Sequence, residues 1–274
     1  MHQKEKLRVA IFASDDFVWS FPTWVKTIPF LARNFHLTGL GLFPRKFGPA
    51  KKGFSPFWHL KVFGFLNTLV LALYALKVRV VGHFSTINTW DSLALNYGLD
   101  FVRNDDPNSE SVIIWLQKQK VDVVISLIGH IMKKELIQTP NLGIINKHAS
   151  VLPSCKGLFP FFWAKVKDVP TGVSFHLIDE EIDGGKLLLQ KIHPEAKVDQ
   201  SYSMLRFYVD MFFMYPFMIE RAIQALVNKK FCQPASNVSD SYFGLPSRSD
   251  YVAFASKGYK VVRLSDLFYK TPSK

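Results

Sequence analysis

Short apolar runs that alternate with longer helical patterns constrain the fold of this chain most strongly. Residues 7–13 (LRVAIFA), 121–127 (VDVVISL) and 143–147 (GIINK) are compact and mostly apolar, as expected of strands that are covered on both faces. The segments 22–34, 89–97 and 109–119 carry helical patterns, and strand-like residues 35–42 and 100–102 lie among them. This order predicts an α/β fold, a Rossmann-like and mostly parallel sheet with flanking helices, whose ligands bind beyond the carboxyl ends of the strands.

The second half of the chain has a different pattern. Residues 171–178 and 186–192 are typical of strands around a loop, and residues 201–227 have the pattern of one long helix. Beyond residue 228 the pattern is mixed and is punctuated by glycine and proline. We therefore predict a main domain over residues 1–200, followed by a closing helix and a small C-terminal appendage over residues 201–274.

A hydrophobic helical insertion at residues 44–81 interrupts the alternation. One interpretation is an amphipathic helical pair that packs on the domain or in a homodimer. The other is an interfacial element, residues 54–81, whose apolar side chains such as Phe54 contact a membrane while cations meet anionic headgroups. Those cations are Arg45, Lys46, Lys51, Lys52, Lys61, Lys77 and Arg79. The most apolar stretch, 62–76, is shorter than the ~20 residues of a membrane span, so we expect it not to cross.

Composition narrows the partners and the compartment. The formal net charge of +12 favours anionic partners such as nucleotide phosphates, nucleic acid or an acidic membrane face, without choosing among them. The two cysteines lack a CxxC or HExxH pattern, so neither a disulfide framework nor a metal site is expected. The amino terminus lacks the continuous apolar region of a secretory signal. These features favour the cytoplasm, with the insertion placing the protein at the inner face of the membrane in the second interpretation.

Polar residues with catalytic potential follow the strand at 143–147. Asn146 and His148 are two residues apart, so an extended backbone points both side chains to the same side at the strand's carboxyl end. Further along, Asp183 precedes paired glycines that permit a tight turn. Singly, a histidine is usually structural and an aspartate beside glycine usually shapes a turn. Their combination is what favours a reactive site.

The sequence NKHASVLP at residues 146–153, with Gly157, resembles the NxHxSxLPxxxG signature of the folate-dependent formyltransferases. GVSFH at 172–176, followed by IDGG at 182–185, resembles the second signature of that family. The likeness extends from residue 7 to about residue 190. It implies an enzyme that takes a formyl group from 10-formyltetrahydrofolate, without a metal, and that uses Asn146, His148 and Asp183 in catalysis. It also implies pterin contacts at Leu127, Ile128, Gly129, Ile131, Met132, Ile178, Asp179 and Ile182.

The chemistry of formyl transfer gives each of the three polar residues a role. An amide such as that of Asn146 can stabilise a developing oxyanion. His148 titrates near neutral pH and suits removal of a proton from the attacking amine, and Asp183 can orient or charge-stabilise its imidazole. Cys155 lies beside this loop, but no histidine-activation pattern accompanies it, so a nucleophilic role is not expected.

The acceptor amine is less constrained. Ser14, Asp15 and Asp16 replace the glycine-rich phosphate loop of glycinamide ribonucleotide formyltransferases, which argues against that substrate. We expect a nucleotide-linked amino sugar of surface-polysaccharide synthesis rather than a nucleic acid. A methionyl-tRNA formyltransferase-like enzyme stays open, as does an inactive, membrane-associated binding module. Lys156 stands where many amino-sugar members have arginine, and it keeps the positive charge but lacks the bidentate fork of a guanidinium. The residues assigned to the acceptor are Ser150, Lys156, Gly157, Phe159, Trp163 and Tyr242.

Overall fold

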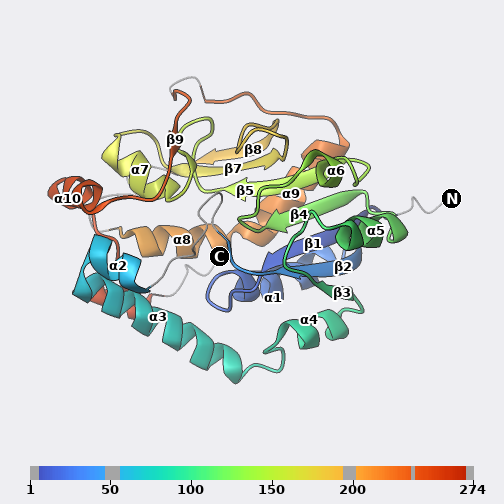
Figure 1. Cartoon of the computed structure of the whole chain (residues 1–274), viewed down its shortest axis with the longest axis horizontal. Coiled ribbons are helices and arrows are strands. Elements are labelled where there is room, and N and C mark those ends of the chain that lie inside the picture. The colour runs from blue at the N-terminus through green and yellow to red at the C-terminus, as the bar shows by residue number, and fades with distance from the viewer. Residues whose placement is uncertain (1–5, 47–55, 194–201, 236–237, 270–274) are drawn as a thin grey trace.

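A seven-stranded sheet forms the centre of the protein in a computed structural model that describes residues 6–46, 56–193, 202–235 and 238–269 (Figure 1). Its strand order is β3-β2-β1-β4-β5-β7-β8, with parallel pairing from β3 to β5 and antiparallel pairing of β5 with β7 and β7 with β8. The predicted Rossmann-like, mostly parallel fold is confirmed. The strands are β1 (Arg8–Ser14), β2 (His36–Phe43), β3 (Asp100–Arg103), β4 (Val123–Leu127), β5 (Gly143–His148), β7 (Gly172–Leu177) and β8 (Leu187–Ile192).

Helices cover both faces of the sheet, which is why its strands are apolar on both sides. Within β1, Val9 and Ile11 belong to one apolar cluster, and Ala10 and Phe12 belong to another on the opposite face. Helices α1 (Ser20–Leu31) and α9 (Tyr215–Val227) contribute to the first cluster, and α5 (Glu110–Lys118) and α6 (Lys134–Ile137) to the second. A short helix, α4 (Trp90–Asn96), leads into β3.

The single long helix predicted over residues 201–227 is wrong. Two helices, α8 (Met204–Phe213) and α9, meet at Met214. Pro216 lies in the first turn of α9, where its missing backbone N–H is tolerated; inside a continuous helix it would remove a hydrogen bond and clash with the preceding turn. Ser203 begins α8 by accepting a hydrogen bond from the backbone N–H of Arg206, whereas Ser201 lies outside the described residues.

The insertion contains the expected pair of helices, α2 (Pro56–Phe63) and α3 (Phe65–His83), which lie along the lower left margin in Figure 1, away from the sheet. Gly64, with φ +82°, separates them. The predicted lipid-facing Phe54 and the cations Lys51 and Lys52 fall in residues 47–55, outside the described part of the chain. The apolar segment is longer than expected, because α3 has 19 residues and a mean hydropathy of 1.5, enough by length and composition to cross a membrane.

The C-terminal appendage contacts both the insertion and the main domain. Its strand β9 (Tyr242–Phe243) pairs in parallel with β6 (Lys156–Gly157), so it touches the loop that follows β5. Helix α10 (Arg248–Ser256) packs against α2 and against α7 (Pro160–Val166), and the 3-10 helix η2 (Leu264–Phe268) packs against α3. The appendage therefore connects the insertion to the loop that carries the candidate site.

Candidate active site

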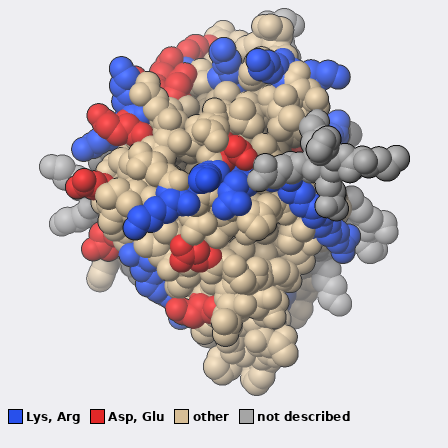
Figure 2. Space-filling model, turned by 90° about the vertical axis from the view of Figure 1, so that its right-hand side faces the viewer, with Lys and Arg blue, Asp and Glu red and all other residues tan. Residues whose placement is uncertain are grey.

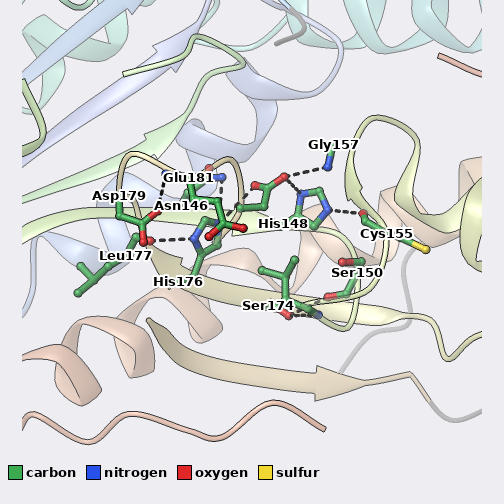
Figure 3. A network of polar contacts seen from close by, with 12 residues as sticks. Asn146, His148, Ser150, Cys155, Gly157, Ser174, His176, Leu177, Asp179 and Glu181 are labelled. Atoms are coloured by element: carbon green, nitrogen blue, oxygen red, sulfur yellow. Dashed lines mark hydrogen bonds and ion pairs between the residues drawn. The ribbon is translucent and has the colours of Figure 1, made fainter. Parts of the chain in front are cut away.

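The two polar residues at the end of β5 lie beside the antiparallel strand β7. Asn146 is paired in register with His176, and His148 with Ser174. In Figure 3 the side chains of Asn146, His148 and His176 gather around one carboxylate. That carboxylate belongs to Asp183, which lies within ion-pair distance of both imidazoles. The structure thus brings the three predicted catalytic residues together and adds a second histidine.

Asp183 is held in place by a turn that depends on glycine. Its own backbone has φ 52°, and a Cβ on Gly185 would lie 1.9 Å from the carbonyl oxygen of Leu177, closer than any side chain can approach. The Asp183 Oδ2 accepts a hydrogen bond of 2.9 Å from the backbone N–H of Gly157. The DGG sequence therefore aims the carboxylate at the loop that follows β5.

The imidazole of His148 lies between two oxygen acceptors. Its Nε2 is 2.8 Å from the carbonyl oxygen of Cys155, and its Nδ1 is 3.4 Å from Asp183 Oδ2. Since a carbonyl can only accept, Nε2 carries the proton, which leaves Nδ1 as the basic nitrogen. Burial lowers the pKa of His148 below its usual value, although Asp183 and the Cys155 carbonyl oppose this. His148 is therefore neutral at physiological pH and can accept a proton.

Asp183 keeps its negative charge despite its burial. Burial by itself raises the pKa of a carboxyl, but His148, His176 and the Gly157 amide together hold the pKa of Asp183 well below its usual range. An ionised carboxylate beside a neutral imidazole stabilises that imidazole once it is protonated. The pair therefore suits general-base chemistry.

His176 was not among the predicted catalytic residues. Its Nε2 lies 3.5 Å from Asp183 Oδ1 and 3.4 Å from Asn146 Nδ2, and its Nδ1 is 2.9 Å from the carbonyl oxygen of Leu177. The side chain therefore links the carboxylate to the amide of Asn146. Its place at the end of the GVSFH segment was the available signal, but a histidine inside an apolar strand pattern is also typical of a structural residue.

The loop after β5 is fixed by internal hydrogen bonds and contains a cis Leu152–Pro153 peptide bond. Ser150 Oγ donates to the carbonyl oxygen of Ser154 at 2.7 Å. Burial raises the pKa of the Cys155 thiol to about 11, so the thiol stays protonated at neutral pH. This supports the expectation that Cys155 is not a nucleophile.

Two cavities meet at the polar cluster. The first, which we call the isoleucine cavity, has a volume of about 240 Å³ and lies between the irregular segment after β4 and the segment that leads to Asp183. It is lined by the predicted pterin contacts Ile128, Gly129, Ile131, Met132, Ile178, Asp179 and Ile182, together with Tyr242. Apolar side chains thus form walls around polar groups at one end, where Asn146 and His148 lie. This suits a flat heterocycle.

The second cavity, which we call the aromatic cavity, has a volume of about 380 Å³ and opens on the side of the insertion. Its aromatic side chains are Trp19, Phe63, Phe159, Tyr208 and Phe212, and its charged and titratable ones include Asp16, Arg45, Lys46, His59 and Lys147. Both cavities are bordered by Asn146, His148 and Gly157. Two ligands bound in them would therefore meet at the polar cluster.

Lys147 lies between Asn146 and His148 in sequence and borders both cavities. Its Nζ is 3.8 Å from the ring centroid of Phe212, and among the residues that the structure describes it forms no ion pair. Burial lowers the pKa of Lys147 to about 7. A cation held without a carboxylate partner is a candidate contact for an anionic ligand group, and sequence reasoning did not assign it.

Several residues predicted to bind the acceptor lie outside the two cavities. Ser150, Lys156 and Trp163 border neither cavity. The Lys156 Nζ is already engaged by Glu181 at 2.7 Å and Asp240 at 3.0 Å, and the Trp163 indole donates to the Gly244 carbonyl oxygen at 3.0 Å. Of the other residues assigned to the acceptor, Gly157 and Phe159 border the aromatic cavity and Tyr242 borders the isoleucine cavity. Leu127, which was assigned to the pterin, borders the aromatic cavity.

A metal centre is not formed by the residues in the described ranges. Within residues 6–46, 56–193, 202–235 and 238–269, no group of three or more His, Cys, Asp or Glu side chains is arranged to hold a metal ion.

The segment that contains the polar cluster matches a known family. Residues 94–207 match the sequence model described as formyl transferase, and this range includes Asn146, His148 and Asp183. These residues are similar in sequence to the formyl transferases. The methionyl-tRNA formyltransferase of Thermodesulfovibrio yellowstonii is 35% identical over 101 residues, which are 36% of this chain and 33% of that protein. The match therefore spans about a third of the length of that relative.

Solved structures share the fold of this chain. A sugar N-formyltransferase from a Shewanella species superposes with a TM-score of 0.55 and 17% identity, over 92% of this chain and 87% of that one. An N-formyltransferase from Helicobacter canadensis, solved with folinic acid and dTDP-3-aminofucose, gives a TM-score of 0.53 and 19% identity, over 90% of this chain and 72% of that one. At these identities the similarity establishes the fold.

Proposed function

We propose that this protein transfers the formyl group of 10-formyltetrahydrofolate to the amine of a nucleotide-linked amino sugar. The observation that carries the proposal is the meeting of two cavities at Asn146 and His148, with Asp183 within 3.4 Å of that histidine. The fold of the sugar N-formyltransferases and the match of residues 94–207 support it. Placement of the reaction in surface-polysaccharide synthesis, at the cytoplasmic face of a membrane, is part of the same proposal.

In this proposal the isoleucine cavity takes the folate, which supplies the formyl group when bound. Its apolar walls suit the flat pterin, and the backbone of residues 128–132 offers hydrogen-bonding groups at the edge. The amide of Asn146 can donate a hydrogen bond to a carbonyl oxygen that gains negative charge. The Nδ1 of His148 would take the proton from the attacking amine and pass it to the folate nitrogen as the bond between that nitrogen and the formyl carbon breaks. Asp183, 3.4 Å away, would stabilise the intervening imidazolium.

The aromatic cavity takes the acceptor. Its rings provide surfaces for a base or a sugar, and the cations Arg45, Lys46 and Lys147 outnumber the carboxylate of Asp16 along its wall. Arg45 lies 3.9 Å from Asp16, so part of this charge is already balanced. The remaining positive charge favours an acceptor that carries phosphate.

Formylation assays test the proposal. The purified protein is incubated with 10-formyltetrahydrofolate and a panel of thymidine- and uridine-diphosphate amino sugars, beside aminoacylated initiator tRNA, and products are identified by mass spectrometry. We expect formylation of a nucleotide amino sugar and its loss in His148→Ala, with His36→Ala, an exposed histidine on β2, as the matched control. Activity on tRNA alone would favour the methionyl-tRNA formyltransferase-like alternative. Failure to consume the donor with every amine would favour an inactive binding module.

A further inference from the structure

Helix α3 presents an apolar stripe to solvent. Leu66, Leu69, Leu73, Leu76 and Val80 follow one another at spacings of three and four residues, so they share one face of the helix, and their side chains are between 41% and 74% exposed. Within α3, which the structure describes throughout, Val70 alone is buried. A helix at the surface of a soluble domain normally turns its polar face outward, so this one has the opposite arrangement.

The apolar surface continues beyond this stripe. Phe57 and Leu60 of α2 form a shallow cavity of about 280 Å³ with Phe65 and Leu69 of α3. At the other end of α3, Val81 and Phe84 are 65% and 83% exposed, and Leu95 of α4 is 84% exposed. Figure 2 shows a lobe without charged side chains at the lower edge of the molecule, at the height where α3 and α4 lie in Figure 1. Contiguous apolar surface of this extent marks an interaction site.

The charge around this surface identifies what covers it. Helices α2 and α3 contain three Lys or Arg and no Asp or Glu. On α4, Asp91 lies one helical turn from Leu95, but its carboxylate is paired with Arg103 at 3.1 Å. Among the described cations, Lys61, Lys77 and Arg79 are exposed on the two helices of the insertion. A second copy of this chain would oppose the same cations across a symmetric interface, which disfavours self-association. An anionic lipid surface offers both acyl chains for the stripe and negative charge for its margins.

The inner face of α3 determines how the helix meets a bilayer. Tyr74 stacks on Trp19 at 5.7 Å between ring centroids, Asn67 donates to the Tyr251 hydroxyl at 2.9 Å, and the Lys77 Nζ donates to the Leu267 carbonyl oxygen at 2.6 Å. Crossing the membrane would break these contacts and would carry Lys77 and Arg79 into the hydrocarbon region. We propose that α2 and α3 dock the protein on an anionic membrane, with the α3 stripe lying in the headgroup and acyl boundary.

The docking surface lies behind the aromatic cavity. His59 and Phe63 of α2 and Leu71 of α3 form part of the wall of that cavity, which also contains Asn146 and His148. A docked molecule therefore holds its acceptor cavity next to the bilayer. This placement suits an acceptor amine attached to a phosphate-bearing lipid carrier, a refinement that rests on the proposed function, whereas the docking does not.

Vesicle sedimentation tests the docking. Wild-type protein is mixed with vesicles made of equal parts phosphatidylglycerol and phosphatidylcholine, or of phosphatidylcholine alone. We expect the protein to sediment with the anionic vesicles, and less so at high salt, because salt screens the charges. For the Leu66→Gln/Leu73→Gln variant we expect a partition coefficient that is roughly tenfold lower, because the variant lacks two leucine side chains that would move from water into the membrane. Ile114→Gln on α5 is the control, since Ile114 is 40% exposed and Leu73 is 41% exposed.

Three results would overturn the proposal. The first is no sedimentation of the wild type with anionic vesicles. The second is self-association that Leu66→Gln/Leu73→Gln abolishes while vesicle binding is absent. The third is membrane association that resists alkaline carbonate, which indicates a spanning helix. The two substituted leucines lie outside both cavities, so formylation of a soluble amino sugar should persist in this variant. Absence of formyl transfer with intact vesicle binding would count against the proposed function alone.

Discussion

Replacement of Lys147 by methionine tests whether a half-buried ammonium is held in the site at a cost to stability. Methionine keeps the length of the side chain over the Phe212 ring but removes the charge. The pKa of Lys147 falls from 10.5 to about 7 in the folded protein. At ~1.36 kcal/mol for each pKa unit, this corresponds to an upper bound of about 5 kcal/mol, and the partial exposure of the side chain reduces the expected effect to about 2 kcal/mol.

The sign of this effect depends on pH. Since the folded pKa lies below the unfolded one, the penalty is complete below about pH 7 and disappears as the pH rises toward ~10.5. We therefore expect Lys147→Met to raise the free energy of unfolding in urea by about 2 kcal/mol near pH 6, and to have little effect near pH 10. An equal gain at both pH values, or a loss near pH 6, would refute the reasoning. In the formylation assay the same variant should raise the KM for a phosphate-bearing acceptor more than it changes kcat.

Three further substitutions probe the site. Asp183→Asn should reduce kcat by ~10²–10⁴-fold. It should also lower the pKa of His148 further, because the Asp183 carboxylate raises that pKa. NMR titration of the His148 imidazole measures this pKa, and a rise in the variant would contradict the prediction. Gly185→Ala should lower the free energy of unfolding by at least about 3 kcal/mol, because its Cβ would lie 1.9 Å from a carbonyl oxygen. Gly82→Ala is the control and should not destabilise the protein, because its Cβ would meet nothing within 4 Å. Similar melting temperatures for the two variants would refute the steric argument. Cys155→Ser should keep kcat within about twofold, since the thiol is protonated at neutral pH. A roughly tenfold loss of kcat would instead indicate that the Cys155 thiolate takes part in catalysis.

The sequence predicted most of the sheet because its strands are buried on both faces. Strands β1, β4 and β5 are compact apolar runs, and no solvent-facing pattern competes with that signal. The shared orientation of Asn146 and His148 follows from the two-residue period of a strand. The break at Met214 was missed because Pro216 lies within an otherwise continuous apolar pattern. The two-residue strands β6 and β9 are too short to produce any periodicity.

The parts of the site that escaped prediction depend on contacts between distant segments. His176 becomes part of the polar cluster through its register with Asn146 across two antiparallel strands, which its own neighbours in sequence do not reveal. Lys156 was assigned to the acceptor by its position in the loop, but Glu181 and Asp240, which are far away in sequence, engage its ammonium group. The walls of the aromatic cavity come from the segment before α1, the insertion, β5 and α8, so a linear pattern could not have defined them.

The pairing of β9 with β6 makes the tail a component of the reactive loop. Ser241 Oγ accepts a hydrogen bond from the backbone N–H of Cys155, and the Phe243 ring stacks on Trp163 at 4.7 Å between ring centroids. Exchange of this tail with that of a relative would therefore disturb the backbone carbonyl that holds His148 unless the loop were exchanged as well. The tail and the loop after β5 are therefore expected to change together in evolution, although more than eighty residues of chain separate them.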